Sequence, residues 1–585
     1  MTSWTQKKLR IDVVADFAVE RSKSGPNAEF IQFIKDLYKH AAPEELNNRP
    51  IEELYAAALS LWKYAQQRDK NLCKIRVFNP TLEEHGWPAS HTIIQIINDD
   101  MPFLLDSVTS NLLEDGNDLH MLVHPIMTFK RDAKGNITTD KAGKEVTESI
   151  MHIEITAMTD PEQIAELEAK LSKVLGFVRA AIDDWKVMLG KMDDVGKNLK
   201  SLPKTVLDPQ KRDVAVNFLN WLKNDNFTVL GYREYFHDSK APHKTKGEGY
   251  GMLREPDEYV LKGPEGLVPT SPEIEDFMAQ DEIMLITKAN VKSLIHRVVH
   301  LDYIGFKKFD KKGATISEVR FVGLFTAQSY NQQAATVPYL DQKVQHVVSE
   351  SGFSAESHDG RALMHILETL PRDELFQIDE EQLLETAMGI LHLKVVPRCR
   401  AFIRKDRFER YVSALVFVPR DLYDSTLRGK VETILCEAFN GELSSRYAQL
   451  SNERIARWHF IIRTKPGDVP NPDTDSINKR LNEVAQRWTD HLQEVLNDRW
   501  GEEVGTTLFR TYHKSFSESY REHFDARFAV TDIEKLEQLP ESQNIQFNFY
   551  RLVEDPDHAI RLKIYTSRQT IAWSDCLPML ENLGL

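Results

Sequence analysis

The most regular stretch of the chain opens with a nearly unbroken apolar run, made of Ile93, Ile94, Ile96 and Ile97. Such a run is typical of a strand buried on both faces. After Asp100 the spacing becomes helical, and one apolar face is formed by Met101, Leu104, Leu105, Val108 and Leu112. We expect Asp100 to cap this helix, Pro102 to lie in its first turn and Gly116 to end it.

The residues that follow continue the same unit. Alternating apolar and polar positions predict strands over 119–130 and 150–158, joined by a polar hairpin connection at 131–144. A long helix then starts near Asp160, with an apolar face formed by Ile164, Leu167, Leu171 and Val174. Strand–helix–strand–strand–helix is most of a ferredoxin-like βαββαβ unit. The nearest candidate for the remaining strand is Lys74–Phe78.

The same order of elements partly recurs further along the chain. Strands are predicted at Arg400–Arg404, Tyr411–Val418 and Ile455–Thr464. One helix lies between the second and third of these strands, and another is predicted over Ile477–Leu496. We therefore expect a second ferredoxin-like unit, although no repeat of the amino-acid sequence itself is visible.

A third copy is predicted at 545–585, where Ile560, Leu562 and Ile564 alternate with polar residues. Ser574 is the expected N-cap of the helix after this strand, and Gly584 suits its C-terminal end. A strand–helix pair alone leaves apolar faces uncovered. We therefore expect this chain to be the front part of a larger protein.

The middle of the chain predicts a different arrangement. An antiparallel sheet is expected from strands at Phe227–Tyr235, Ile283–Lys288, Ser293–Phe309 and Ile316–Tyr330. Two helices should follow, at 337–350 and 358–370, with Ser357 or Asp359 near the start of the second.

Together these elements predict an α+β, multidomain chain with no Rossmann domain. The expected order is an N-terminal helical segment (1–72), a first ferredoxin-like domain (73–200), an antiparallel-sheet domain (205–335), a helical connector (336–395), a second ferredoxin-like domain (396–500) and a truncated third one (501–585).

Composition narrows the possible partners and location. The formal net charge of -15 argues against nucleic acid as a partner, and no apolar run is long enough for a membrane span. The N-terminus lacks the apolar core of a secretory signal. The four cysteines form no C-x-x-C pair and indicate neither a zinc ribbon nor a disulfide framework. A cytoplasmic location is the default expectation.

Most motifs with known chemistry are missing from the sequence. There is no G-x-G-x-x-G fingerprint, no Walker lysine motif and no G-x-S-x-G elbow. The pairs His120/His124 and His296/His300 have a spacing that shares one strand face, but neither has an evident third zinc ligand. The basic residues of the middle sheet are expected to form a solvated face, and they are Lys288, Lys292, Arg297, Lys307 and Lys308.

One turn remains a candidate ligand site. Asn98, Asp99 and Asp100 lie between the first buried strand and its helix, where the backbone N–H groups of the helix start are free donors. The turn could bind a small effector, or Asp100 could simply cap the helix. Adjacent carboxylates disfavour an anionic ligand unless one of them is neutralised.

Long segments of the chain resemble the large bacterial NAD-specific glutamate dehydrogenases, a family distinct from the small hexameric enzyme. The similar segments are IINDDMPFLLDSVTSNL (96–112), ESIMHIEI (148–155), FLNWLKNDNFTVLGYREY (218–235), LITKANVKSLIHRVVHLDYIGFKKFD (285–310), SHDGRALMHILETLPRDELFQI (357–378), FVPRDLYDSTLR (417–428) and YREHFDARFAVTDIEKLE (520–537).

The resemblance implies that the ferredoxin-like units are ACT-like modules and that the catalytic Rossmann region lies further toward the C-terminus. The family reaction is the NAD-linked oxidative deamination of L-glutamate to 2-oxoglutarate and ammonium. NAD is the cofactor of the full-length family enzyme, and we expect none to bind this chain. No position here matches the family's cofactor-binding glycines or catalytic lysine and aspartate, so no catalytic, cofactor-binding or metal residue is assigned.

The leading expectation is therefore a regulatory and assembly segment of a large NAD-dependent glutamate dehydrogenase. It would form a homo-oligomer through its ACT-like domains and could bind an amino-acid effector. The alternatives are a stand-alone amino-acid-binding protein of the ACT type and a catalyst in its own right. The second alternative needs a nucleotide site that the sequence does not announce.

Overall fold

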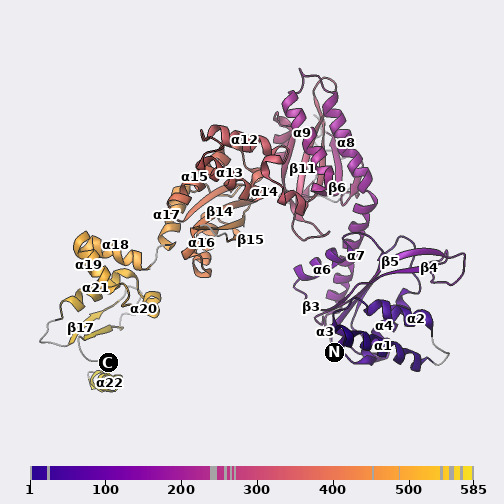
Figure 1. The fold of residues 1–585 in the computed structure, drawn as a ribbon, viewed down its shortest axis with the longest axis horizontal. Coiled ribbons are helices and arrows are strands. Elements are labelled where there is room, and N and C mark those ends of the chain that lie inside the picture. The colour runs from indigo at the N-terminus through magenta and orange to yellow at the C-terminus, as the bar shows by residue number, and fades with distance from the viewer. Residues whose placement is uncertain are drawn as a thin grey trace. The chain divides into compact units, whose positions relative to one another are not determined.

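The computed structural model describes residues 3–22, 27–236, 247–255, 260–263, 266–268, 272–450, 454–485, 488–539, 545–551, 559–566 and 571–582. The chain divides into two units, Met1–Met388 and Gly389–Leu585. Both units combine helices with sheets (Figure 1). Every strand pair among the described residues is antiparallel. The predicted mixed, multidomain class with several antiparallel sheets is confirmed.

Four helices at the start of the first unit cover one face of its first sheet. They are α1 (Ser3–Arg21), α2 (Ala28–Tyr38), α3 (Pro43–Asn47) and α4 (Ile51–Ala65). The apolar stripes of α2 and α4 are buried in one cluster with the sheet residues Ile97, Met121, Val123, Met127 and Ile150. The helical prediction for this part of the chain is confirmed, and the burial of these helices depends on the sheet that follows them.

The first sheet has the strand order β1-β2-β5-β3, with β4 also paired to β5. Its strands are β1 (Lys74–Phe78), β2 (Thr92–Asp99), β3 (Leu119–Val123), β4 (Ile126–Arg131) and β5 (Lys144–Ile155). The strand predicted to complete the unit does so, because β1 pairs with β2 along its whole length. The short helix α5 (Leu82–His85) lies between these two strands. Helices α6 (Leu104–Glu114) and α7 (Pro161–Asp183) pack against each other in the same unit.

The single strand predicted at 119–130 was wrong. The structure has two strands there, separated at His124 and Pro125. Proline has no N–H to donate to a strand ladder, so the pairing with β5 is interrupted at this point.

The second sheet of this unit has the order β10-β11-β12-β6-β7. Its strands are β6 (Phe227–Phe236), β7 (Gly249–Gly251), β10 (Met284–Lys292), β11 (His300–Phe309) and β12 (Thr315–Phe325). Around it lie α8 (Trp185–Ser201), α9 (Pro209–Trp221), η1 (Leu222–Asn226), β8 (Leu261–Gly263), β9 (Gly266–Val268) and α10 (Pro272–Ala279). The predicted antiparallel sheet is confirmed, with two corrections to its strands.

Both corrections concern a strand that was predicted too long. Residues 293–299 form a turn rather than the start of β11, because their hydrogen bonds close locally, from the Ser293 N–H to the Val299 carbonyl. The strand predicted to reach Tyr330 ends at Phe325, and a short helix capped by Thr326 follows it.

Helices complete the first unit and lead into the second. They are α11 (Ala327–Asn331), η2 (Ala334–Thr336), α12 (Leu340–Glu350), α13 (His358–Thr369), α14 (Arg372–Gln377) and α15 (Glu380–Val395). Of the two N-cap candidates for α13, Ser357 is the cap, since its side chain accepts the Gly360 N–H. The two predicted helices are confirmed as α12 and α13.

The second unit repeats the topology of the first sheet. Its elements are β13 (Arg400–Lys405), β14 (Tyr411–Pro419), η3 (Arg420–Leu422), α16 (Ser425–Ala438), β15 (Glu442–Gln449), β16 (Ile455–Arg463) and α17 (Thr474–Ala485). The strand order β13-β14-β16-β15 corresponds element for element to β1-β2-β5-β3. The predicted recurrence is therefore confirmed in three dimensions. Strand β15 was not predicted, because most of its residues are exposed and it lacks an apolar alternation.

The helix predicted over Ile477–Leu496 was wrong, since two helices occupy this range. α17 belongs to the second repeat, whereas α18 (Trp488–Trp500) packs with α19 (Glu502–Tyr512), α20 (Glu518–His523) and α21 (Ala526–Glu537). The core of this helical cluster is Leu492, Leu496, Ala526, Ala529, Val530 and Ile533.

The last described elements match the first half of the repeat. They are β17 (Ile545–Tyr550), β18 (Arg561–Thr566) and α22 (Trp573–Asn582). β18 is anchored to α21, because Asp532 accepts hydrogen bonds from Lys563 Nζ (2.6 Å) and Tyr565 Oη (2.7 Å). The predicted N-cap Ser574 lies inside α22, which begins one residue earlier, and Gly584 lies outside the described residues.

One face of β17 leaves three large apolar side chains in solvent. Ile545, Phe547 and Phe549 are 45%, 56% and 60% exposed. Exposed apolar patches promote association, so we expect the double variant Phe547→Ser with Phe549→Ser to self-associate less and to bind less of the dye ANS than the unchanged chain. Size-exclusion chromatography with light scattering measures the first effect. Gln546→Ser, on the opposite face of β17, is the control, and equal association of all three proteins would show that another surface is responsible.

Candidate functional site

The candidate turn starts with the last two residues of β2, Asn98 and Asp99, and it does not cap α6. The helix starts at Leu104, and its N-cap is Phe103, whose φ of 69° lies in the left-handed region. The predicted capping role of Asp100 and the place of Pro102 inside the first helical turn were therefore wrong. The reason is that sheet pairing continues through the turn, since the Asp100 N–H donates to the Thr147 carbonyl.

Asp99 is neutralised by two arginines from distant parts of the chain. Its carboxylate lies 2.5 Å from Arg68 Nη2 and 2.8 Å from Arg179 Nη2. Burial alone would raise the pKa of Asp99, but the hydrogen bonds and charges of the two guanidinium groups outweigh it and hold the pKa below its ordinary value of 3.8. The condition that one of the adjacent carboxylates be neutralised is met at Asp99.

Asn98 is fully buried, with 0% of its surface exposed. Its Oδ1 accepts a hydrogen bond from Arg179 Nη2 at 2.5 Å. Its Nδ2 has no hydrogen-bond partner among the described residues. A buried amide N–H without a partner is uncommon. At the other end of the turn, the side chain of Asp100 is exposed.

The turn continues into a buried charge cluster that the sequence did not reveal. Glu148, directly opposite Asp99 in the sheet, is 0% exposed. It accepts hydrogen bonds from Arg68 Nε (2.9 Å) and from Arg131 Nε and Nη2 (2.7 Å each). Arg131 also donates to the carbonyls of Gly135 and Ala65. The cluster therefore ties the end of α4 to three strands of the first sheet.

Asp99→Asn is expected to lower the free energy of unfolding by about 1–3 kcal/mol at pH 7, because it removes a charge-assisted contact to two arginines. Since the folded pKa of Asp99 is depressed, this stability is present above its ordinary value of 3.8 and is lost as the pH falls through the depressed folded value. The difference between the two proteins should therefore shrink as the pH falls below 3.8. Hydrogen exchange of the β2 and β5 amides as a function of urea, repeated at a series of pH values, measures it. Asp100→Asn is the matched control, and a pH-independent difference would contradict the assignment.

The structure gives the four candidate histidines separate polar partners. His120 Nε2 lies 3.1 Å from Thr156 Oγ1, and His124 Nε2 lies 2.7 Å from Ser149 Oγ. His296 Nδ1 lies 3.0 Å from an Asp106 oxygen, and His300 Nδ1 lies 3.2 Å from the Ala289 carbonyl oxygen. No group of three or more potential metal ligands occurs among the residues that the structure describes.

The expected solvated basic face of the middle sheet is confirmed for Lys292 and Arg297, which are exposed, and is wrong for Lys307, which is buried. Its cations contact carboxylates or backbone carbonyls that are remote in sequence, namely Asp302 and Asp373 for Lys288, Glu114 for Lys292, Phe325 for Arg297, Gln280 for Lys307 and Glu234 for Lys308. The amphipathic pattern placed these side chains on a sheet, but long-range packing provides their partners.

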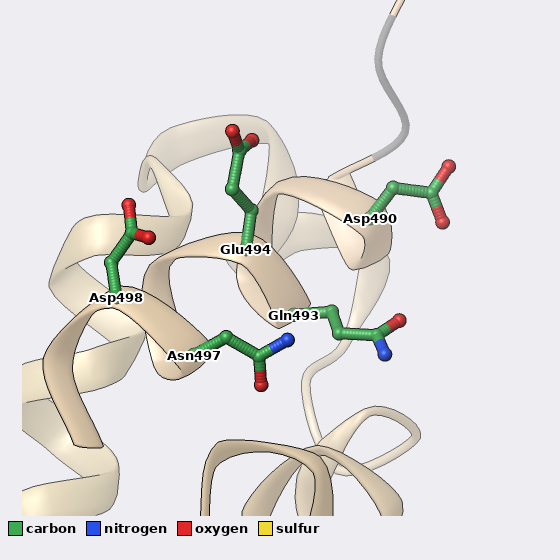
Figure 2. Close-up of a pocket in the computed structure, with 5 residues that line it drawn as sticks. All are labelled: Asp490, Gln493, Glu494, Asn497 and Asp498. Carbon is green, nitrogen blue, oxygen red and sulfur yellow. The ribbon is translucent and has the colours of Figure 1, made fainter. Parts of the chain in front are cut away.

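A shallow pocket lies along α18 in the second unit (Figure 2). It is lined by Asp490, Gln493, Glu494, Asn497 and Asp498. The three carboxylates follow one another at i, i+4 and i+8 on a single helix, and no basic or nucleophilic side chain lines the pocket. It offers no arrangement suited to acid–base or nucleophilic catalysis.

None of the helices that the structure describes is long and apolar enough to cross a membrane.

Sequence comparisons agree with the order of elements described above. Residues 33–171, 400–489 and 544–585 match the ACT1, ACT2 and ACT3 domains of glutamate dehydrogenase. Residues 337–395 and 495–539 match helical motifs 1 and 2 of the same family. The chain is 34% identical to the NAD-specific glutamate dehydrogenase of Halomonas elongata over 99% of its own length. This chain is a relative of the NAD-specific glutamate dehydrogenases.

Two further relatives have the same name. The protein of Pseudomonas aeruginosa is 31% identical over 94% of this chain, and that of Mycobacterium tuberculosis is 26% identical over 84%. This chain spans only 37%, 34% and 30% of the lengths of the three proteins. The family resemblance and the ACT-like nature of the repeated units are confirmed.

Proposed function

We propose that this chain is a regulatory and assembly segment of an NAD-dependent glutamate dehydrogenase whose catalytic region lies outside these 585 residues. The observation that carries the proposal is the identity of the matched parts. All five are ACT domains or helical motifs of glutamate dehydrogenase, and they follow one another along the chain. The relatives are about three times as long, which leaves room in them for a separate catalytic region.

The reaction of such an enzyme converts L-glutamate, NAD⁺ and water to 2-oxoglutarate, ammonium, NADH and a proton. NAD would accept a hydride from the glutamate Cα. Dinucleotides bind at the carboxyl ends of parallel strands, beside a glycine-rich turn. The described strands pair only in antiparallel fashion, so the residues here do not fit this type of NAD site. We assign NAD binding and the chemical step to the part of the enzyme outside this chain.

An amino-acid effector is the ligand class that best suits the Asn98–Asp100 turn. Asp99 is already neutralised by Arg68 and Arg179, which removes the repulsion that would otherwise exclude a carboxylate. The exposed Asp100 could hold an α-ammonium group, and the Asn98 amide adds a buried donor nearby. This combination supports a zwitterionic ligand better than a simple anion.

Assembly would use the exposed edges of the repeated sheets. β15 lies at the end of its sheet, and Tyr447 on it is 59% exposed. An unprotected edge strand readily pairs with a second copy. We therefore propose a homo-oligomer, and analytical ultracentrifugation tests it.

The decisive experiment is an NAD-linked glutamate oxidation assay on the purified 585-residue chain, with the full-length Halomonas elongata relative as positive control. We expect NADH formation from the control and none from this chain. Turnover by this chain above the background of a mock purification would overturn the proposal and show that it contains a dinucleotide site of another kind.

A further inference from the structure

The turn at residues 293–299, called the 293–299 turn below, docks onto α6 of the first repeat. It joins β10 to β11, and its main chain forms hydrogen bonds with side chains of α6. Ser107 Oγ accepts the His296 N–H at 2.9 Å, and Ser110 Oγ donates to the His296 carbonyl at 3.1 Å. Asn111 Nδ2 donates to the Leu294 carbonyl at 2.9 Å. These bonds join groups more than 180 positions apart in the sequence.

Helix α6 has a buried apolar face and also contacts the 293–299 turn. Leu104, Val108 and Leu112 are buried, as the sequence predicted for its apolar face. The polar residues that hold the 293–299 turn border this apolar face, and Ser107 and Asn111 are each only 1% exposed. Buried polar side chains that are fully engaged fix one arrangement of the elements they join. The 293–299 turn therefore has one defined position on α6.

Two residues at this contact have a backbone conformation that side chains rarely adopt. Phe103 has φ 69° and His296 has φ 66°. Their rings pack against each other with centroids 5.2 Å apart, and His296 also pairs with Asp106. A positive φ is an outlier for a bulky residue such as Phe103, whereas His is one of the residue types that adopt it more often. Such a conformation persists where the surroundings over-determine it, so the contact between α6 and the turn holds Phe103 in place.

The strands that flank this turn also hold helical motif 1. Lys288 on β10 and Asp302 on β11 face each other in the ladder, and Lys288 Nζ lies 2.6 Å from the Asp302 carboxylate. The same ammonium group lies 3.2 Å from Asp373 of α14, which also accepts a hydrogen bond from Tyr330 Oη. One hairpin thus contacts α6 with its turn and α14 with β10.

We propose that the β10–β11 hairpin is a coupling lever between the first ACT-like domain and helical motif 1. A change in α6, which starts four residues after Asp100 of the candidate effector turn, alters the position of the 293–299 turn. The hairpin passes this change to α14 through Lys288, whose ammonium group contacts both Asp302 and Asp373. The regulatory meaning of this lever rests on the proposed function, but its mechanical coupling does not. A spatial chain of contacts is not evidence of coupling by itself, so the test has to measure coupling directly.

The test is hydrogen exchange with mass spectrometry on the full chain and its variants. His296→Ala removes the ring contact to Phe103 and the contact with Asp106. It substitutes no residue of α6 or α14. We expect amide exchange to rise at least about fivefold both in the 293–299 turn with α6 and in α14. Val299→Ala, in the same turn but with no hydrogen bond from its side chain, is the matched control and should leave α14 unchanged. Asn111→Ala, which attacks the contact from the other side, should reproduce the effect of His296→Ala.

A double-mutant cycle then separates coupling from general loosening. Asp373→Asn should raise exchange in α14, and this rise should be smaller in the His296→Ala background if the two sites share one lever. Faster exchange at α6 without any change in α14 would overturn the proposal. So would no change at either place, or an equal rise in α2, which packs against α1 and α4. None of these outcomes depends on glutamate oxidation, so the lever and the proposed function can fail separately.

Discussion

Replacing Glu148 by glutamine is expected to lower the free energy of unfolding of the first unit by about 3–5 kcal/mol. The substitution keeps the shape of the side chain but removes its charge. Arg68 and Arg131, which are 3% and 5% exposed, would then be buried with a neutral amide in place of the carboxylate that accepts three of their hydrogen bonds. Breaking a buried ion pair costs more than the pair contributes, because the remaining charges stay desolvated.

The measurement is hydrogen exchange of the β2 and β5 amides as a function of urea, because a chain with two units does not unfold in one step. Glu145→Gln on the same strand is the matched control. That carboxylate is 69% exposed and lies 4.0 Å from Lys130 Nζ, so its loss should change stability by less than about 0.5 kcal/mol. Equal effects of the two substitutions would show that the buried cluster contributes no more than a surface pair.

The repeated element order could be predicted because its signals are local. The spacing of apolar residues alone predicts the buried strand before Asp100 and the helix after it. The same spacing predicts β14 and α16. Strand β15 was missed for the converse reason. It pairs at the sheet edge with most side chains in solvent, so burial leaves no apolar alternation in its sequence.

The 293–299 turn shows where local pattern fails. Its sequence SLIHRVV is rich in β-branched residues and reads as a strand. Tertiary contacts decide otherwise, since the turn is seated on α6 and His296 adopts a positive φ there. No signal near residue 296 could have indicated a partner at residue 107.

The position of the candidate turn could be predicted from the sequence, but the charges that surround it could not. A strand that ends in Asn98, Asp99 and Asp100 before a helix marks the position of the turn. The partners of Asp99 lie 31 and 80 positions away, at Arg68 and Arg179. Sequence separation of this size leaves no periodic signal. We therefore expected two adjacent carboxylates without a nearby cation, whereas the carboxylate of Asp99 is paired with two arginines.

The second large effect is expected in the second repeat, at Trp458 on β16. Its side chain is 1% exposed, and its ring stacks on Tyr423 with centroids 5.0 Å apart. It belongs to the cluster that joins the sheet to α16 and α17. Trp458→Ala would leave a cavity in this core and should cost about 3–5 kcal/mol of unfolding free energy.

Trp458→Phe separates packing from hydrogen bonding. The indole N–H has no hydrogen-bond partner among the described residues, so phenylalanine gives up ring volume but no polar contact. Its cost should stay near about 1–2 kcal/mol, well below that of alanine. Tyr447→Ala on the neighbouring β15 is the exposed control and should change stability by less than about 0.5 kcal/mol. Hydrogen exchange in β14 and β16 reports these differences, and β2 in the other unit should be unaffected. Equal losses for Trp458→Ala and Trp458→Phe would mean that the indole N–H, through a bound water, stabilises this core more than the ring does.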